Sequence, residues 1–138
     1  QVLAVCGCHN LRRAARTVTQ LYDDALQPSG LRATQVVLMV TLAMDEEINL
    51  SGLAREMALS PSTLSRNLRP LERDGLISIV EGARRRKSVR LTERGHRALV
   101  KVVPYWEKAQ AKFTGLVGEQ AWTDLSKRLA AAIAAVRN

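Results

Sequence analysis

The side chains of this 138-residue chain that could do chemistry fall into two groups. Near the beginning, Cys6 and Cys8 are separated by one residue and followed by His9. Further along, hydroxyl and guanidinium side chains are concentrated between Ser60 and Arg86. Thiolates bind soft metals and react with oxidants, whereas Ser, Thr and Arg side chains donate hydrogen bonds to phosphates and base edges. The sequence therefore indicates thiol chemistry at one end and polyanion binding in the middle.

The middle group lies on one side of a predicted helix over residues 61–73. Ser60 is suited to cap this helix, and Pro61 to its first position, where a missing N–H costs nothing. Leu64, Leu68 and Leu71 follow the i, i+4, i+7 spacing of a buried face. The remaining side chains are short, polar or basic, and such a face can enter a major groove about 12 Å wide. The predicted DNA contacts of this region are Ser60, Ser62, Thr63, Ser65, Arg66 and Arg69.

A β-hairpin is predicted directly after this helix, which Asp74-Gly75 ends. Residues 76–80 and 87–91 are rich in β-branched and apolar side chains and flank a loop with one glycine, so they are expected to pair as two strands. The loop carries three further predicted DNA contacts, Arg84, Arg85 and Arg86.

The charge of the chain is concentrated in the same region. Residues 60–97 contain ten basic and four acidic side chains, a net +6 out of the total of +8. Such clustering is the electrostatic signature of a nucleic-acid-binding surface. Because only 4% of the residues are aromatic, a stacking platform for single strands is disfavoured. The predicted partner is double-stranded DNA.

The other elements are helices that surround this region. The fold class expected is mainly α with a small β-hairpin wing: a winged helix-turn-helix flanked by N- and C-terminal dimerisation helices. A polar turn over 45–49 and a short strand at Ile48 and Leu50 precede the helix-turn-helix, and Pro104 is expected to kink the long helix. The remaining helices are predicted over residues 11–26, 35–44, 51–57, 93–113 and 119–136.

The chain is expected to be a single domain, residues 1–138, that forms a homodimer. The winged lobe covers about residues 48–92, and the dimerisation helices cover about 1–30 and 100–138. These outer helices carry more apolar surface than one small lobe can cover, and self-association would bury it. The alternative is one larger monomeric core. A twofold dimer also places two recognition helices about 34 Å apart, one turn of DNA.

Four segments make the chain resemble the MarR family of bacterial transcriptional regulators. They are Leu53-Ala54, Ser60-Pro61-Ser62-Thr63-Leu64-Ser65-Arg66, Leu71-Glu72-Arg73-Asp74-Gly75-Leu76-Ile77 and Val89-Arg90-Leu91-Thr92-Glu93-Arg94-Gly95. The order of the flanking helices also matches, so the resemblance covers nearly the whole chain. It implies a homodimer whose first and last helices pack together and whose helix 61–73 reads the major groove.

The resemblance also implies that an arginine at the hairpin tip enters the minor groove. Counting back from Leu91-Thr92 places Arg85 at that position, with Arg84 and Arg86 beside it. The family usually has Asp two residues before this arginine, where this chain has Ala83.

Three interpretations of the cysteines remain open. Cys8 is in register with the apolar stripe through Leu11, so it could simply be a buried thiol. It could instead sense oxidants or electrophiles, because some members of the family that the chain resembles do so through a cysteine near this terminus. Cys6 and Cys8 could also bind a soft metal or arsenite with His9. Residues two apart in a helix diverge by about 200°, which disfavours a bond between the two thiols.

A small organic effector is the other possibility that the resemblance implies. Members of the family bind aromatic carboxylates and phenols between the dimer helices and the winged lobe. In this chain Tyr22, Met39 and Trp106 are the expected lining residues.

The sequence does not indicate an enzyme. It has no glycine-rich phosphate loop, no H-E-x-x-H motif and no evident paired carboxylates, so no catalytic residues, metal or cofactor are assigned. No apolar run is long enough to span a membrane, and a cytoplasmic protein is expected. The function predicted is a homodimeric, sequence-specific regulator, a repressor released by an effector. The alternatives are a non-specific architectural DNA-binding protein and a metal- or arsenite-responsive regulator.

Overall fold

The computed structural model describes residues 1–45 and 47–137, with Arg85 described by its backbone alone. Glu46, in the predicted polar turn, and Asn138 lie outside the described residues. The elements are α1 (Val2–Val5), α2 (Gly7–Leu26), η1 (Gln27–Ser29), α3 (Ala33–Met44), β1 (Ile48–Asn49), α4 (Leu50–Met57), α5 (Pro61–Arg73), β2 (Ile77–Glu81), η2 (Ala83–Arg85), β3 (Lys87–Leu91), α6 (Glu93–Val117) and α7 (Glu119–Arg137).

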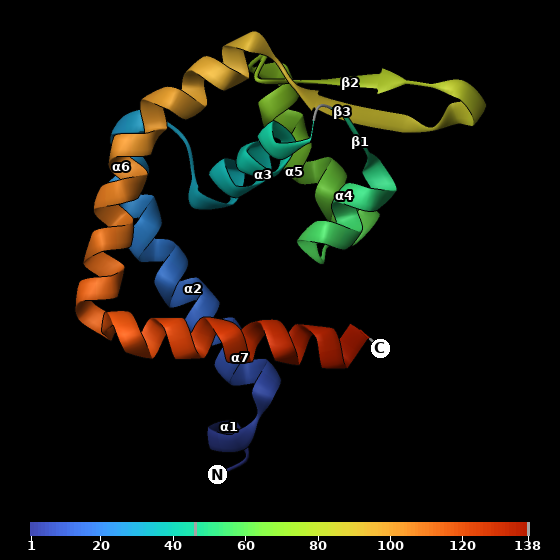
Figure 1. Ribbon diagram of the computed structural model, residues 1–138. Coiled ribbons are helices and arrows are strands. Elements are labelled where there is room, and N and C mark those ends of the chain that lie inside the picture. Colours follow the sequence, from blue (N-terminus) through green and yellow to red (C-terminus); the bar gives the residue numbers. More distant parts are fainter. Residues whose placement is uncertain (46, 138) are drawn as a thin grey trace.

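A three-stranded antiparallel sheet and three helices form the winged lobe. The strand order is β1-β3-β2, with Val89 of β3 opposite Ile48 on one side and Ile79 on the other. Helices α3, α4 and α5 pack against the sheet over one core, to which α5 contributes Leu64, Leu68 and Leu71. The hairpin of β2 and β3 extends well beyond the helices (Figure 1). The predicted fold class is confirmed.

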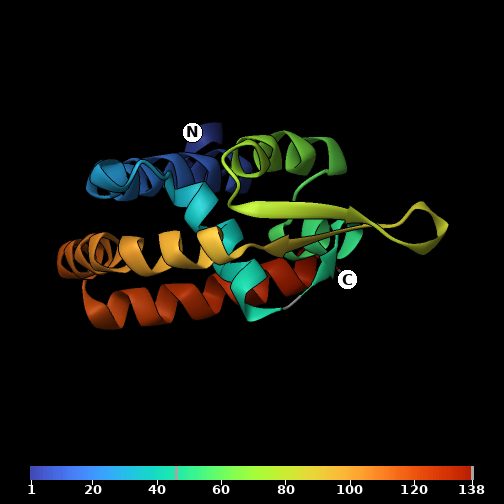
Figure 2. The same ribbon diagram turned by 90° about the horizontal axis from the view of Figure 1, so that it is seen from above.

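The remaining helices form an arm beside this lobe. The polypeptide leaves the lobe through α6, which packs along α2. Helix α7 then turns back beside α6, on the side away from α2 (Figure 1, Figure 2). A small second core of Leu26, Val36 and Val102 joins α2, α3 and α6. None of the described residues of α7 is buried. Within the described ranges, no helix is long and apolar enough to cross a membrane.

The beginning of the chain differs from the prediction of one helix that starts at Leu11. The structure has the short helix α1 and the longer α2, separated by Cys6, whose backbone is extended (φ −72°, ψ 112°). The Asn10 side-chain amide donates to the carbonyls of Leu3, Ala4 and Cys6 at 2.8–3.2 Å. The bonds to Leu3 and Ala4 satisfy carbonyls at the end of α1, whereas the Cys6 carbonyl also accepts from the Asn10 N–H at 3.0 Å. The break is thus stabilised by a side chain.

Pro104 does not end α6, which continues through it as a single helix. Proline lacks the N–H that would bond to the carbonyl four residues earlier, and its ring pushes that carbonyl aside. Figure 1 shows α6 bent along its length rather than straight.

The first turn of α6 is fastened to the turn between α5 and β2. The Thr92 hydroxyl donates to the Gly75 carbonyl at 2.6 Å and accepts from the Gly95 N–H at 3.0 Å, while the Thr92 N–H donates to the Leu76 carbonyl at 3.0 Å. Gly95 is buried, and a Cβ there would lie 2.2 Å from the Leu76 carbonyl oxygen and 2.7 Å from Leu91 Cδ1. We call this set of contacts the Thr92 joint. It requires glycine at position 95 because helix and strand touch there.

Gly95→Ala is expected to lower the free energy of unfolding by about 1–3 kcal/mol, because backbone must move to make room for the methyl group. Gly115→Ala is the matched control in the same helix, where a Cβ would meet nothing within 4 Å. That change should stabilise α6 by about 0.5–1 kcal/mol through helix propensity. Urea unfolding of both variants at one protein concentration measures the two effects. Equal effects would contradict the close approach at Gly95.

Candidate DNA-binding surface

The N-terminus of α5 is capped by Ser60. The Thr63 N–H donates to Ser60 Oγ at 3.2 Å, and the Ser60 hydroxyl also lies 2.9 Å from Thr63 Oγ1. Pro61 occupies the first turn, as expected. This local network holds the start of α5 in one conformation and leaves its outer face unobstructed.

The structure divides the predicted contacts of α5 into two sets. Ser62, Ser65, Arg66 and Arg69 are exposed, whereas Thr63 is half-buried beneath the Ser60 cap. Arg66 and Arg69 are three residues apart, so both guanidinium groups project from the same side of the helix. The face opposite the buried leucines thus presents two hydroxyls and two guanidinium groups to solvent.

The hairpin carries the second set of basic side chains. Its loop is closed by the Gly82 N–H, which donates to the Arg86 carbonyl at 2.6 Å, and by the pairing of Glu81 with Lys87. Arg84 has a left-handed backbone (φ 61°), and both Arg84 and Arg86 are exposed. The structure also assigns the Arg85 backbone to the short helix η2 at the tip of the hairpin. Figure 2 shows this tip as the part of the chain that extends furthest from the helices.

A groove between the hairpin and the start of α4 lies beside the second set and was not expected from the sequence. It measures about 580 Å³ and is lined by Asn49, Leu50, Ser51, Arg86 and Lys87. Asn49 caps α4 by accepting from the Gly52 N–H at 2.7 Å. Backbone N–H groups at a helix start and nearby cations suit a phosphate. The asparagine directly before a short helical run was the signal that could have indicated this groove.

The basic side chains of this surface are not neutralised by acidic neighbours. Among the side chains that the structure describes, the only ion pair within 4.0 Å joins Arg73 to Asp74, at 3.7 Å. That pair lies at the C-terminal end of α5, whereas Arg66, Arg69 and Arg84 have no such partner. The surface therefore retains its positive charge for a polyanion.

Tyr22 and Trp106 line a separate cavity between α2, α3 and α6. It measures about 290 Å³ and has mostly apolar walls. The Tyr22 hydroxyl donates to Gln110 Oε1, and burial raises the pKa of Tyr22, so the phenol stays neutral at physiological pH. Met39 does not line this cavity as expected. It is completely buried and belongs to the core cluster of the lobe, which includes Leu64, Leu68 and Val89.

The two cysteines lie at the break between α1 and α2. Cys6 is half-buried and caps α2, its sulfur accepting from the His9 N–H at 3.4 Å, and Cys8 is exposed in the first turn. Because Cys6 precedes the helix, the divergence of about 200° expected for two helical residues does not apply to this pair. Among residues 1–45 and 47–137, no group of three or more His, Cys, Asp and Glu side chains is placed to hold a metal.

Comparison with known protein families matches residues 31–81 to the MarR family. This segment runs from the turn before α3 to the end of β2 and contains all of α5. The comparison with curated proteins finds no match.

Solved structures with the same fold cover almost the whole chain. The transcriptional regulator MosR of M. tuberculosis, solved in complex with DNA, is 39% identical, with a TM-score of 0.80 over 94% of this chain and 98% of that one. AbsC, a MarR family transcriptional regulator from Streptomyces coelicolor, is 26% identical, with a TM-score of 0.79 over 96% and 93%. CouR from Rhodococcus jostii RHA1, solved with p-coumaroyl-CoA bound, is 25% identical, with a TM-score of 0.76 over 94% and 92%.

Proposed function

Since the chain belongs to the MarR family of transcriptional regulators, we propose that it is a homodimeric repressor that binds a specific operator and is released from it by an effector. Members of this family are DNA-binding transcription factors and not enzymes. The proposal places the protein in the cytoplasm, where its operator DNA lies.

One observation carries the proposal: the exposed polar face of α5 lies next to a projecting basic hairpin. Arg66 and Arg69 can each form paired hydrogen bonds with the O6 and N7 atoms of a guanine. The hydroxyls of Ser62 and Ser65 can form hydrogen bonds with base edges or with phosphate oxygens. The hairpin projects beyond the helices (Figure 2). With α5 in the major groove, a hairpin that projects in this way can reach the adjacent minor groove. The DNA complex of MosR, at 39% identity, supports duplex DNA as the partner.

The dimer is supported by apolar side chains that the single chain leaves uncovered. Val2, Leu3 and Val5 of α1 are exposed, as are Leu11 of α2 and Ile133 of α7. These residues belong to the arm, at the two ends of the chain, and a second copy packed against them would remove their surface from water. A twofold pair would then hold two copies of α5 for two half-sites of one operator.

Two kinds of effector fit the structure. The cavity lined by Tyr22 and Trp106 can hold an apolar or aromatic group between the lobe and the arm, and the complex of CouR with p-coumaroyl-CoA supports an organic ligand. Alternatively, Cys8 is exposed on the arm, on the face where we place the second copy. Oxidation of its thiol would introduce a polar group into that contact, at a cost of about 1–3 kcal/mol.

The first prediction of this proposal concerns base recognition by α5. Arg69→Ala and Arg66→Ala should each lose about 1–3 kcal/mol of binding free energy at particular half-site positions, because a paired contact with one base is removed. The experiment selects bound duplexes from random DNA, determines how many chains bind each duplex, and measures binding of both variants to single-base changes of the selected operator. Lys127→Ala on α7, an exposed basic residue outside the surface, is the control.

The same experiment distinguishes the architectural alternative. A regulator should bind scrambled DNA orders of magnitude more weakly than its operator, whereas an architectural protein should not. Equal losses of both arginine variants on every sequence would show that these residues contact phosphates only.

The arginines of the hairpin are expected to behave differently from those of α5. Arg84→Ala, Arg85→Ala and Arg86→Ala should weaken binding to all sequences and reduce the slope of log K against log salt by about one unit per lost contact, because each contact releases counterions from DNA. Titrations at several salt concentrations measure this slope. If it is unchanged in all three variants, the hairpin does not bind DNA.

The cysteines provide the test of a thiol effector. Peroxide converts a thiol to a sulfenic acid with loss of water, and it should lower the operator affinity of the wild type by about tenfold. The response should persist in Cys6→Ser and disappear in Cys8→Ser. Loss in both variants would mean that the two thiols act together, and parallel titrations with arsenite or zinc would show whether they do so through a metal. A wild type that keeps its DNA under every treatment contradicts thiol sensing.

A further inference from the structure

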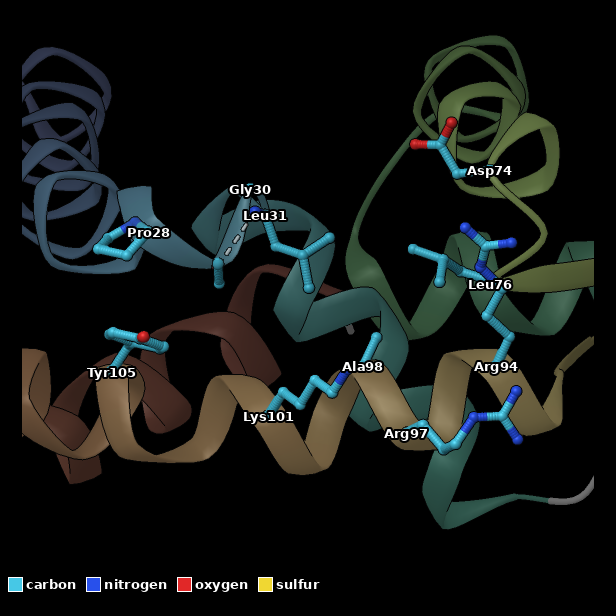
Figure 3. A pocket seen from close by; sticks show the side chains of 11 residues that line it. Pro28, Gly30, Leu31, Asp74, Leu76, Arg94, Arg97, Ala98, Lys101 and Tyr105 are labelled. Carbon is cyan, nitrogen blue, oxygen red and sulfur yellow. Dashed lines mark hydrogen bonds between the residues drawn. The ribbon is translucent and has the colours of Figure 1, made fainter.

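A second, larger cavity lies on a different side of α6 from the one lined by Tyr22 and Trp106. It measures about 820 Å³, and three segments surround it: the turn between α2 and α3, the turn between α5 and β2, and the N-terminal half of α6 (Figure 3). We call it the basic groove. Its lining residues are Pro28, Ser29, Gly30, Leu31, Asp74, Leu76, Arg94, Arg97, Ala98, Lys101 and Tyr105.

The α6 side of the basic groove carries an ordered row of side chains. Arg94, Arg97 and Lys101 are followed by Tyr105, at intervals of three or four residues, so all four lie along one face of the helix. At 1.5 Å per residue, the row is about 16 Å long. Figure 3 shows the two arginines at one end and Tyr105 near Pro28 at the other. The groove therefore has a cationic end and an aromatic end.

Among the described residues, no acidic side chain forms an ion pair with the cationic end of the groove. Neither Arg94, Arg97 nor Lys101 has an acidic side chain within 4.0 Å among the described residues. Asp74 is the one carboxylate in the lining, and it pairs with Arg73, which lies outside the lining. The Arg94 stem rests near Gly75, where an added Cβ would lie 3.7 Å from Arg94 Cδ. The guanidinium group of Arg94 extends toward Leu76 and Asp74 (Figure 3), and among the described residues it has no ion-pair partner within 4.0 Å.

The aromatic end is apolar and anchored. Leu31 and Tyr105 pack against the second core. Leu76, which belongs to the core of the lobe, lies toward the other end of the groove beside Arg94 (Figure 3). Leu31 points toward α6, and the ring of Tyr105 lies on the same side as Pro28 (Figure 3). A planar or aliphatic ligand group that binds between Leu31 and Tyr105 would move from water to side chains that are already in place. Little side-chain entropy would therefore be lost on binding.

We propose that the basic groove binds a small organic phosphate, a molecule that joins a phosphate group to an aromatic or other apolar group. Arg94 and Arg97 hold the phosphate, because guanidinium forks donate two parallel hydrogen bonds to its oxygens. Lys101 adds positive charge midway along the groove, and Leu31, Pro28 and Tyr105 contact the apolar part. The occupant touches the Thr92 joint on its lobe side, at Leu76, whose carbonyl belongs to the joint, and reaches Ala98 of α6.

The experiment uses three probes on the full chain without DNA at about 0.15 M salt, where interactions between distant exposed charges are screened. They are 1-naphthyl phosphate, 1-naphthol and inorganic phosphate, and calorimetric titration measures their binding. The naphthyl phosphate should bind more tightly than either of the others. Arg97→Ala and Lys101→Ala should each weaken it by about fivefold, as expected for the loss of a charged partner in an open groove. Lys108→Ala, an exposed lysine of α6 outside the lining, should leave it unchanged.

Three outcomes would overturn the proposal. Equal binding of naphthyl phosphate by all four proteins would show non-specific attraction to a basic chain. Naphthol that binds as tightly as its phosphate would exclude a phosphate site. A loss of operator affinity in Arg97→Ala and Lys101→Ala without any probe would show that the row contacts the DNA backbone instead. Because binding of the three probes is measured without DNA, a failure to bind naphthyl phosphate can be distinguished from a failure of the proposed repressor function.

Discussion

The arrangement of this molecule depends on the Thr92 joint. One hydroxyl links the Gly75 carbonyl to the N–H of Gly95, and the absence of a side chain at Gly95 lets α6 approach the Leu76 carbonyl directly. The joint connects the end of the predicted recognition helix α5 to the start of the arm. Two of its hydrogen bonds reach from Thr92 to the turn before β2 and one lies within the first turn of α6, so together they set the direction in which α6 leaves the lobe. The position of α5 relative to α7 follows from that direction.

Burial is distributed unevenly on the two sides of the joint. The lobe has a continuous core to which α3, α4, α5 and the sheet all contribute, whereas the buried cluster between the arm and the lobe, Leu26, Val36 and Val102, is small. The Thr92 joint and a hydrogen bond from the Arg137 side chain to the Arg55 carbonyl also connect the two parts. Beyond it, Phe113 contacts Tyr22 and Trp122 with ring centroids 6.1 and 5.0 Å apart, and α7 buries no described residue. A densely packed winged lobe joined to a loosely packed arm suits the dimeric, effector-responsive regulator that we propose. A ligand bound between the two parts can shift one against the other.

Much of the lobe could be read from local sequence. Ser60-Pro61 and the leucine spacing placed α5 at residues 61–73, and the structure has the same bounds. The long helix predicted from residue 93 begins at that residue, and the strands of the hairpin differ from the prediction by at most one residue. Such features succeed because capping, periodicity and strand pairing across a short loop involve residues a few positions apart. The break at Cys6 was missed because side-chain bonds from Asn10 stabilise it.

The candidate DNA surface and the basic groove differ in this respect. The exposed arginines of α5 and the hairpin form two nearly continuous stretches of sequence, so composition and helical spacing were enough to find them. The groove is built from residues near 30, 75 and 100, which no period or motif connects. Met39 and Tyr22 likewise looked equivalent as apolar helix positions, yet Met39 is buried in the core of the lobe and Tyr22 packs against the second core. The spacing of apolar residues along the sequence shows which face of a helix or strand is buried. Which other element covers that face depends on packing between segments far apart in the sequence.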